Sequence, residues 1–130
     1  MYEKILVPLD GSALAERAIR HAEEIARGIR SEILLLQAVS FPIPVVPEAF
    51  LLPDSKWLAE ARKDALRYLD GIAAPLREAG MRVRTMVDER PPADAIPHVA
   101  AREEIDLIVM STHGRGGVTR LLMGSVAASV

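Results

Sequence analysis

A glycine-rich segment near the end of the chain carries the residues best suited to chemistry. Residues 111–125 include four glycines, two arginines and a closing Gly124-Ser125 pair. Glycines let a backbone approach an anion closely, and a helix starting at Gly124-Ser125 would present free N–H groups to it. Arg115 could neutralise phosphate charge. The segment is therefore either a phosphate cradle or a flexible connection followed by an ordinary capped helix.

Two standard phosphate-binding motifs are absent from this segment. The Walker A motif requires a Gly-Lys-Ser/Thr step, but the three lysines of the chain stand at positions 4, 56 and 63. The dinucleotide motif G-x-G-x-x-G would need a glycine where the chain has Thr119. The sequence therefore gives no support to P-loop phosphoryl transfer or to dinucleotide redox chemistry.

The sequence offers no set of residues for covalent or acid–base catalysis. It has no cysteine and no G-x-S-x-G elbow, and no carboxylate pair is arranged for proton transfer. Its three histidines are scattered, which argues against a histidine-rich metal site. We therefore predict no catalytic residue, leave the question of enzymatic activity open, and favour a binding or regulatory protein.

Composition excludes several classes of partner. The 130 residues carry 16 Lys+Arg against 18 Asp+Glu, a net charge of -2, unlike a strongly basic nucleic-acid-binding protein. No apolar stretch approaches the roughly 20 residues that span a bilayer. The first residues lack the basic and apolar regions of a signal peptide. We expect a cytoplasmic protein with neither a nucleic-acid nor a membrane partner.

The hydrophobic pattern predicts alternating strands and helices in one domain, residues 1–130. Continuous apolar runs are typical of parallel strands covered on both faces, and strict alternation with helices implies an α/β, doubly wound, open sheet. The alternating run 81–87 is typical of an edge strand. Strands are expected at 5–9, 33–36, 81–87 and 106–110, and a loop at 111–117. Helices are expected at about 12–28, 55–80 and 124–130, with a shorter one that opens at 91–92 and turns Ile96, Val99 and Ala100 inward.

Ligands of such a sheet bind beyond the carboxyl ends of its strands. Residues 8–12, 38–40 and 110–117 follow three of those ends. Asp10 could bind a ribose or a Mg²⁺ ion through its carboxylate. The alternative is that it shapes the turn with its own side chain, as aspartates at strand ends do.

Three segments of the chain are distinctive: KILVPLDGS at residues 4–12, DLIVM at 106–110 and STHGRGGVTRLLMGSV at 111–126. Through these segments the chain resembles the universal stress protein family over essentially its whole length. ATP-binding members of that family carry Gly, two residues, Gly, nine residues and Gly-Ser/Thr. Here Gly114, nine further residues and Gly124-Ser125 match the second half of that motif, and Ser111 replaces its first glycine.

The resemblance implies an adenine nucleotide, ATP with or without Mg²⁺, laid across the carboxyl ends of strands 1, 2 and 4. Asp10 would be the residue nearest a metal ion carried by the nucleotide. The expected nucleotide-binding residues are Pro8, Leu9, Asp10, Ala38, Val39, Met110, Ser111, Gly114, Arg115, Gly124, Ser125 and Val126.

The resemblance also implies a Rossmann-like strand order of 3-2-1-4 with helices on both faces. Family members usually continue into a fifth strand that commonly forms a dimer edge, and we expect that strand to be missing from these 130 residues. The implied function is that of an ATP-binding regulator of the stress response, as a homodimer with a further, unidentified protein partner. Two alternatives stay open: a nucleotide-free stress protein that acts through protein contacts, and a slow ATPase.

Overall fold

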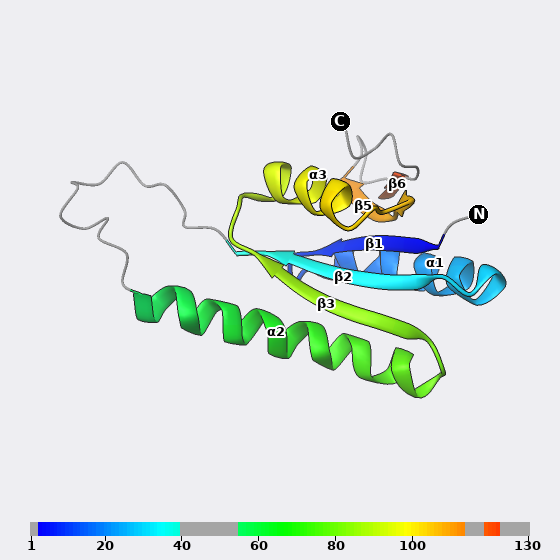
Figure 1. The fold of residues 1–130 in the computed structure, drawn as a ribbon, viewed down its shortest axis with the longest axis horizontal. Coiled ribbons are helices and arrows are strands. Elements are labelled where there is room, and N and C mark those ends of the chain that lie inside the picture. Colours follow the sequence, from blue (N-terminus) through cyan, green and yellow to red (C-terminus); the bar gives the residue numbers. More distant parts are fainter. Residues whose placement is uncertain (1–2, 40–54, 114–118, 123–130) are drawn as a thin grey trace.

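The structure, a computed structural model, describes residues 3–39, 55–113 and 119–122. Strands and helices alternate along the chain as far as the fourth strand (Figure 1). The elements in chain order are β1 (Lys4–Leu9), α1 (Ala13–Ile29), β2 (Glu32–Ala38), α2 (Ser55–Glu78), β3 (Arg82–Asp88), α3 (Pro92–Arg102), β4 (Leu107–Ile108), β5 (Met110–His113) and β6 (Thr119–Leu122).

The first four strands form one parallel sheet in the order β3-β2-β1-β4. The predicted fold class and strand order are therefore confirmed. β3 lies at an edge, as its alternating pattern predicted, and its outward residues Arg82 and Arg84 are exposed while Val83 and Val87 are buried. β2 and β3 follow one another on one side of β1, whereas β4 lies on the other side of β1. The switch point of strand order therefore lies between β1 and β4.

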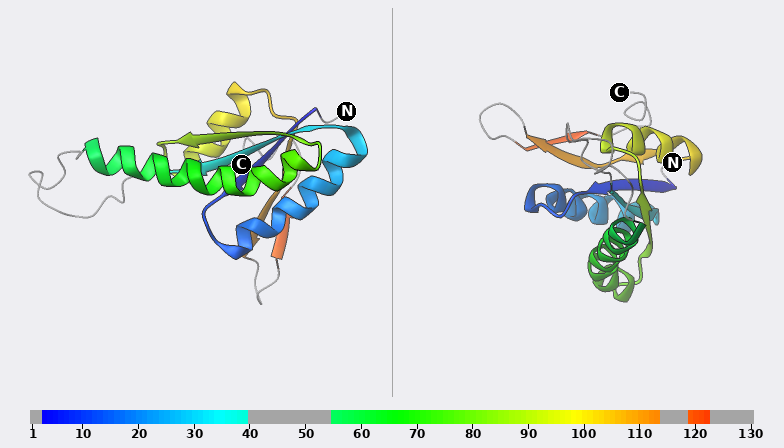
Figure 2. Two further views of the ribbon diagram at one scale, coloured as in Figure 1. Left: turned by 90° about the horizontal axis from the view of Figure 1, so that it is seen from below. Right: turned by 90° about the vertical axis from the view of Figure 1, so that its left-hand side faces the viewer.

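Helices cover both faces of the sheet, as predicted. Figure 2 shows α1 and α2 on one side and α3 on the other. Because successive strand residues point to opposite faces, β2 supplies Ile33 and Leu35 to the α1/α2 side and Leu34 and Leu36 to the α3 side. All four side chains are at most 1% exposed, which explains why this strand is a continuous apolar run.

β1 and β4 are held in register by Asp106, just before β4. Its Oδ2 accepts the backbone N–H groups of Glu3 and Lys4 at 2.9 and 3.0 Å. The Asp106 N–H donates to Lys4 O at 3.0 Å, and the Val109 N–H donates to Leu6 O at 2.9 Å. A short strand is thereby tied to the centre of the sheet at both of its ends.

The chain after β4 differs from the sequence prediction. Residues 111–113 were expected in a loop, but they belong to β5, which pairs antiparallel with β6 and packs against α1. The prediction was wrong because it read the glycine-rich stretch as starting at Ser111 and did not recognise residues 119–122 as a strand partner. β4 itself is shorter than the expected 106–110, because it pairs with β1 only at Leu107 and Ile108 and because Met110 already belongs to β5. The helix expected from Gly124 lies outside the described residues.

Candidate functional site

A cavity lies at the carboxyl end of the sheet, beside the switch point. Its volume is about 140 Å³. The ends of β1 and β2, the first turns of α1 and α3, and the start of β5 enclose it. Its lining residues are Pro8, Leu9, Asp10, Ala15, Leu36, Ala38, Pro92, Ile96, Met110 and Ser111.

The cavity exists because β1 and β4 separate before β1 ends. β4 pairs with β1 only at Ile5 and Leu6, whereas β2 pairs along all of β1. In a parallel sheet the N–H and C=O of one residue point to the same neighbouring strand. The Leu6 oxygen accepts the Val109 N–H, so these groups of Leu6 point to the β4 side. Pro8, two residues later, has the same orientation. Because proline lacks an N–H, it leaves no unpaired donor on the side from which β4 has turned away.

The turn between β1 and α1 forms one wall of the cavity. Asp10 Oδ1 accepts the Ser12 N–H at 2.8 Å, so its carboxylate shapes the turn. Hydrogen bonds from Ser12 hold the pKa of Asp10 below its ordinary value. Gly11 has φ of 87°, a conformation that favours glycine. Ser12 then caps α1, its Oγ accepting the Ala15 N–H at 3.1 Å.

A second helix braces this turn from the α1/α2 side of the sheet. The Tyr68 hydroxyl of α2 donates to Glu16 Oε2 of α1 at 2.7 Å. Burial, and then the Glu16 carboxylate, raise the pKa of Tyr68 above its ordinary value. The bond fixes the first turns of α1, and with them the position of Asp10 and Ala15 on the cavity wall.

Ser111 of β5 also lines the cavity. Its Oγ is buried and has no hydrogen-bond partner among the described residues. Asp10 is the other polar residue of the lining, and the remaining eight are apolar. The described part of the site is thus an apolar slot in which Asp10 and Ser111 are the polar residues of the lining.

The structure brings six of the twelve predicted binding residues to this cavity: Pro8, Leu9, Asp10, Ala38, Met110 and Ser111. Val39 is not among its lining residues; it packs against the core on the α1/α2 side, and its N–H donates to Asp88 O at 2.7 Å. The five others, Gly114, Arg115, Gly124, Ser125 and Val126, lie outside the described residues.

Sequence reasoning missed four lining residues: Ala15, Leu36, Pro92 and Ile96. Pro92 and Ile96 come from α3, which follows β3 at the same edge of the sheet. A signal for them existed, because the segment after any parallel strand starts at the carboxyl edge. Placing that segment over β1 and β2, however, required knowing the path that α3 takes across the sheet.

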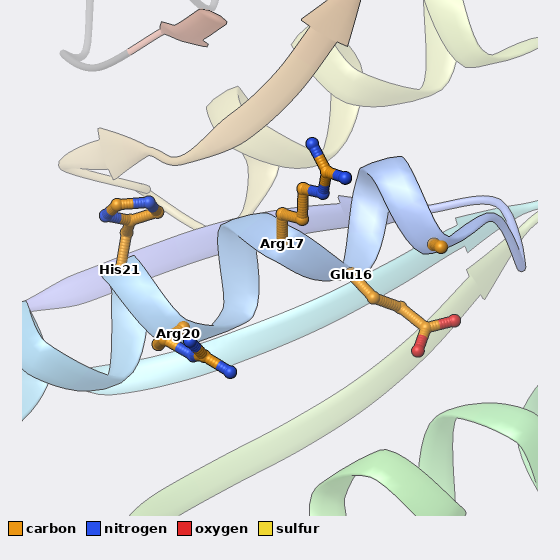
Figure 3. Close-up of a pocket in the computed structure, with 5 residues that line it drawn as sticks. Glu16, Arg17, Arg20 and His21 are labelled. Carbon is orange, nitrogen blue, oxygen red and sulfur yellow. The ribbon is translucent and has the colours of Figure 1, made fainter. Parts of the chain in front are cut away.

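A larger hollow of about 610 Å³ lies along α1 and is lined by Ala13, Glu16, Arg17, Arg20 and His21. Figure 3 shows that these side chains diverge: Arg17 and His21 point towards β5, whereas Glu16 and Arg20 point away from it. Groups that diverge cannot bind one small ligand together. The smaller cavity, whose lining residues converge, is therefore the better candidate site.

The described residues form neither a cluster of metal ligands nor a membrane-spanning helix. Within residues 3–39, 55–113 and 119–122, no three His, Cys, Asp or Glu side chains come together as a metal site would require. None of the helices in these ranges is both long enough and apolar enough to cross a membrane.

Comparison with known proteins decides the family. A family model described as Universal stress protein family matches residues 1–130. The chain belongs to the universal stress protein family. Among its relatives, universal stress protein MJ0531 of Methanocaldococcus jannaschii is 34% identical, with the match covering all of this chain and 76% of that protein.

Solved structures of universal stress proteins have the same fold. The structure of MJ0577 of M. jannaschii matches with a TM-score of 0.71 at 25% identity, over 91% of this chain and 80% of that one. A family member from Arabidopsis thaliana, solved with AMP bound, matches with a TM-score of 0.66 at 23% identity, over 89% and 80% of the two chains. A universal stress protein in complex with cAMP matches with a TM-score of 0.62 at 23% identity, over 84% and 75%.

Proposed function

We propose that this universal stress protein binds an adenine nucleotide, ATP or a close relative, in the cavity at the carboxyl end of the sheet. The observation that carries the proposal is the convergence of six predicted residues from three separate segments on one cavity. That cavity lies beside the switch point, where open α/β sheets bind their ligands. The AMP and cAMP of the two structural neighbours give the ligand class, although their low identity to this chain supports only the fold.

The residues fit such a ligand in two respects. The slot is apolar enough for a base or a sugar ring, and Asp10 supplies a polar residue to its lining. Its 140 Å³ is smaller than the 300–1,000 Å³ typical of complete ligand pockets. Part of a nucleotide would therefore extend beyond the slot.

Mg²⁺ and a regulatory role belong to the same proposal. Asp10 offers a single carboxylate, so a Mg²⁺ ion here would take its other ligands from phosphate oxygens and water, as is usual for this ion. Nucleotide occupancy would then alter contacts within a homodimer or with a protein partner. β4 is an edge of the four-stranded sheet, and an edge strand can pair with a second chain.

The test is a set of thermal melts with and without ATP, AMP and Mg²⁺. A ligand at about 100 times its Kd stabilises the folded state by about 2.7 kcal/mol, or about 10 °C for a chain of this length. The blocking variant is Ala38→Phe, because its ring is the size of benzene, which fills a cavity of about 150 Å³. Ala74→Phe, at an exposed position on α2, is the matched control.

We expect the nucleotide shift in the parent and in Ala74→Phe, and its loss in a folded Ala38→Phe variant. Cooperative melting of the parent with no shift at millimolar nucleotide would refute the proposal. That result would favour the alternative in which the protein acts through protein contacts without a nucleotide. A shift that survives Ala38→Phe would place the ligand elsewhere in the molecule.

A further inference from the structure

The four-stranded sheet has β3 at one edge, where its only strand partner among the described residues is β2. The Asp88 oxygen accepts the Val39 N–H, so the backbone groups of Asp88 point to the β2 side. These directions alternate along a strand, so Val83, Thr85 and Val87 direct their N–H and C=O groups away from the sheet. An outward row of backbone groups is a template for pairing with another strand.

Helix α2 runs alongside this edge (Figure 1). Its side chains hydrogen bond β3 and the residue after it at three levels: Arg77 at Val83, Asp70 at Thr85 and Arg62 at Glu89. Leu66 stands four residues from both Arg62 and Asp70, and therefore on the same face of the helix. It is 37% exposed, one of two large hydrophobic side chains that the described residues expose. An exposed apolar side chain thus lies beside the edge strand.

Arg77 occupies one acceptor of the edge. Its Nε and Nη2 donate to Val83 O at 3.0 and 2.9 Å. Arg77 stands in the last turn of α2, where a cation also offsets the helix dipole. That role does not require a bond to a neighbouring strand, and the two bonds to Val83 O go beyond it. The guanidinium therefore lies where the backbone N–H of a second strand would have to approach.

The residues of β3 complement their own sequence. In an antiparallel pair of two copies centred on Thr85, the opposed residues are Arg82 and Asp88, Val83 and Val87, Arg84 and Met86, and Thr85 with itself. Opposite charges meet at both ends of the pair, no like charges are opposed, and β-branched residues meet between them. Arg82 bonds Arg30 O and Asp88 accepts from Arg90, but each retains hydrogen-bonding capacity for a further partner.

We propose that β3 is a pairing edge for a second copy of this chain, and that the Arg77 guanidinium keeps this edge closed by occupying Val83 O. The partner is a second copy because the strand opposes its own charges and its own apolar side chains in register. Val83 O is one of the acceptors that such a pair needs, so pairing and the Arg77 bonds exclude each other. The edge is separate from the candidate nucleotide site and from β4, so the inference does not rest on the proposed function.

Sedimentation velocity over a concentration series tests the edge. Arg77→Ala frees Val83 O, and we expect its apparent mass to rise with concentration to about twice that of the parent, because a two-fold pair closes on itself. Arg77→Lys retains a charged donor and should keep the mass of the parent. The matched control is Arg67→Ala, which removes the same charge from the same helix at a side chain that is 80% exposed, and it should also keep the mass of the parent.

A second substitution identifies the surface. The Thr85 N–H points outward, so Thr85→Pro removes no bond to β2 but blocks pairing at the centre of the edge. Arg77→Ala combined with Thr85→Pro should therefore return to the mass of the parent. In Arg77→Ala alone, the amides of Thr85 and Val87 should exchange hydrogen more slowly than in the parent. The Met86 amide, which faces β2, should not change.

Three results would overturn the proposal. The first is a folded Arg77→Ala variant with the mass of the parent at every concentration. If that variant does not fold, Arg77→Met replaces it, because methionine retains an apolar side chain but has no donor. The second is association that survives Thr85→Pro or leaves the Thr85 and Val87 amides unprotected, since the contact would then lie on another surface. The third is slow exchange of the Thr85 amide in the parent, which would show that the edge is already paired.

Discussion

Replacing Asp106 by alanine removes the acceptor that ties β1 to β4. One carboxylate oxygen accepts two backbone N–H groups, from Glu3 and Lys4, at the start of β1. β4 contributes only two register pairs of its own, so these bonds are a large part of what fixes it. β1 leads to Asp10 and β4 leads to Ser111, so we expect loss of these bonds also to affect the candidate site at the other end of the two strands.

The size of the effect follows from the two hydrogen bonds. A bond to a charged group contributes about 1.5–3 kcal/mol. Here one oxygen serves both donors, and the Glu3 bond is exposed, so the pair should contribute less than twice that value. We expect Asp106→Ala to lower the free energy of unfolding by about 1–3 kcal/mol and the melting temperature by about 4–11 °C.

Asp106→Asn is the matched control. Its amide oxygen can accept both N–H groups in the same geometry, and only the charge is lost, so we expect less than half the effect of alanine. Urea unfolding monitored by circular dichroism measures both variants, and nucleotide titration then shows whether a loosened β4 weakens binding. If Asp106→Ala were as stable as the parent, or if Asp106→Asn were as strongly destabilised as Asp106→Ala, these two hydrogen bonds would not be what ties β1 to β4.

Two further predictions concern the wall formed by α1. Tyr68→Phe leaves the Glu16 carboxylate without its hydroxyl donor and should lower the free energy of unfolding by about 1 kcal/mol at neutral pH, as urea unfolding would show. The parent should also lose stability relative to this variant above about pH 10, because the folded state raises the pKa of Tyr68 and so resists its ionisation. Asp10→Asn retains an oxygen for the Ser12 N–H but cannot titrate. Folding lowers the pKa of Asp10 from its ordinary value of 3.8, so ionisation of Asp10 stabilises the folded protein fully above that value. This contribution is lost as the pH falls from 3.8 through the lower pKa of the folded state. The variant should therefore lose less stability than the parent as the pH falls from about 6 to 3, measured by unfolding across that range.

The fold could be predicted from the sequence because each strand of the parallel sheet has a recognisable hydrophobic pattern. The buried strands β1, β2 and β4 are continuous apolar runs, and the edge strand β3 alternates. Ser12 caps α1 and Gly11 takes the positive φ of the turn before it, and both residue types are the ones that favour those positions. Local rules of this kind predict where the helices and strands lie, and the parallel topology then fixes the handedness of the connections between strands.

The features that the sequence did not predict depend on contacts between residues that are distant in the sequence. The β5–β6 pairing joins residues 110–113 to residues 119–122, and no local sequence pattern identifies both strands as partners. Pro92 and Ile96 reach the cavity only because α3 crosses back over β2. The unpartnered state of Ser111 is a property of the surroundings of one atom, which composition and spacing do not contain. The predicted roles of Gly114, Gly124 and Ser125 stay predictions.

The link between Lys4 and Asp106 also makes completion of the sheet depend on a contact between distant parts of the chain. These residues are separated by 102 positions, so forming their hydrogen bond closes a loop of most of the chain. The β1-α1-β2 and β2-α2-β3 units involve shorter loops and lower entropy costs, and they can form without β4. The cavity, which needs both β1 and β5, is completed only when the last long-range contact is made. A ligand in this cavity therefore binds only the fully assembled sheet, and its binding free energy acts directly against the opening of β4.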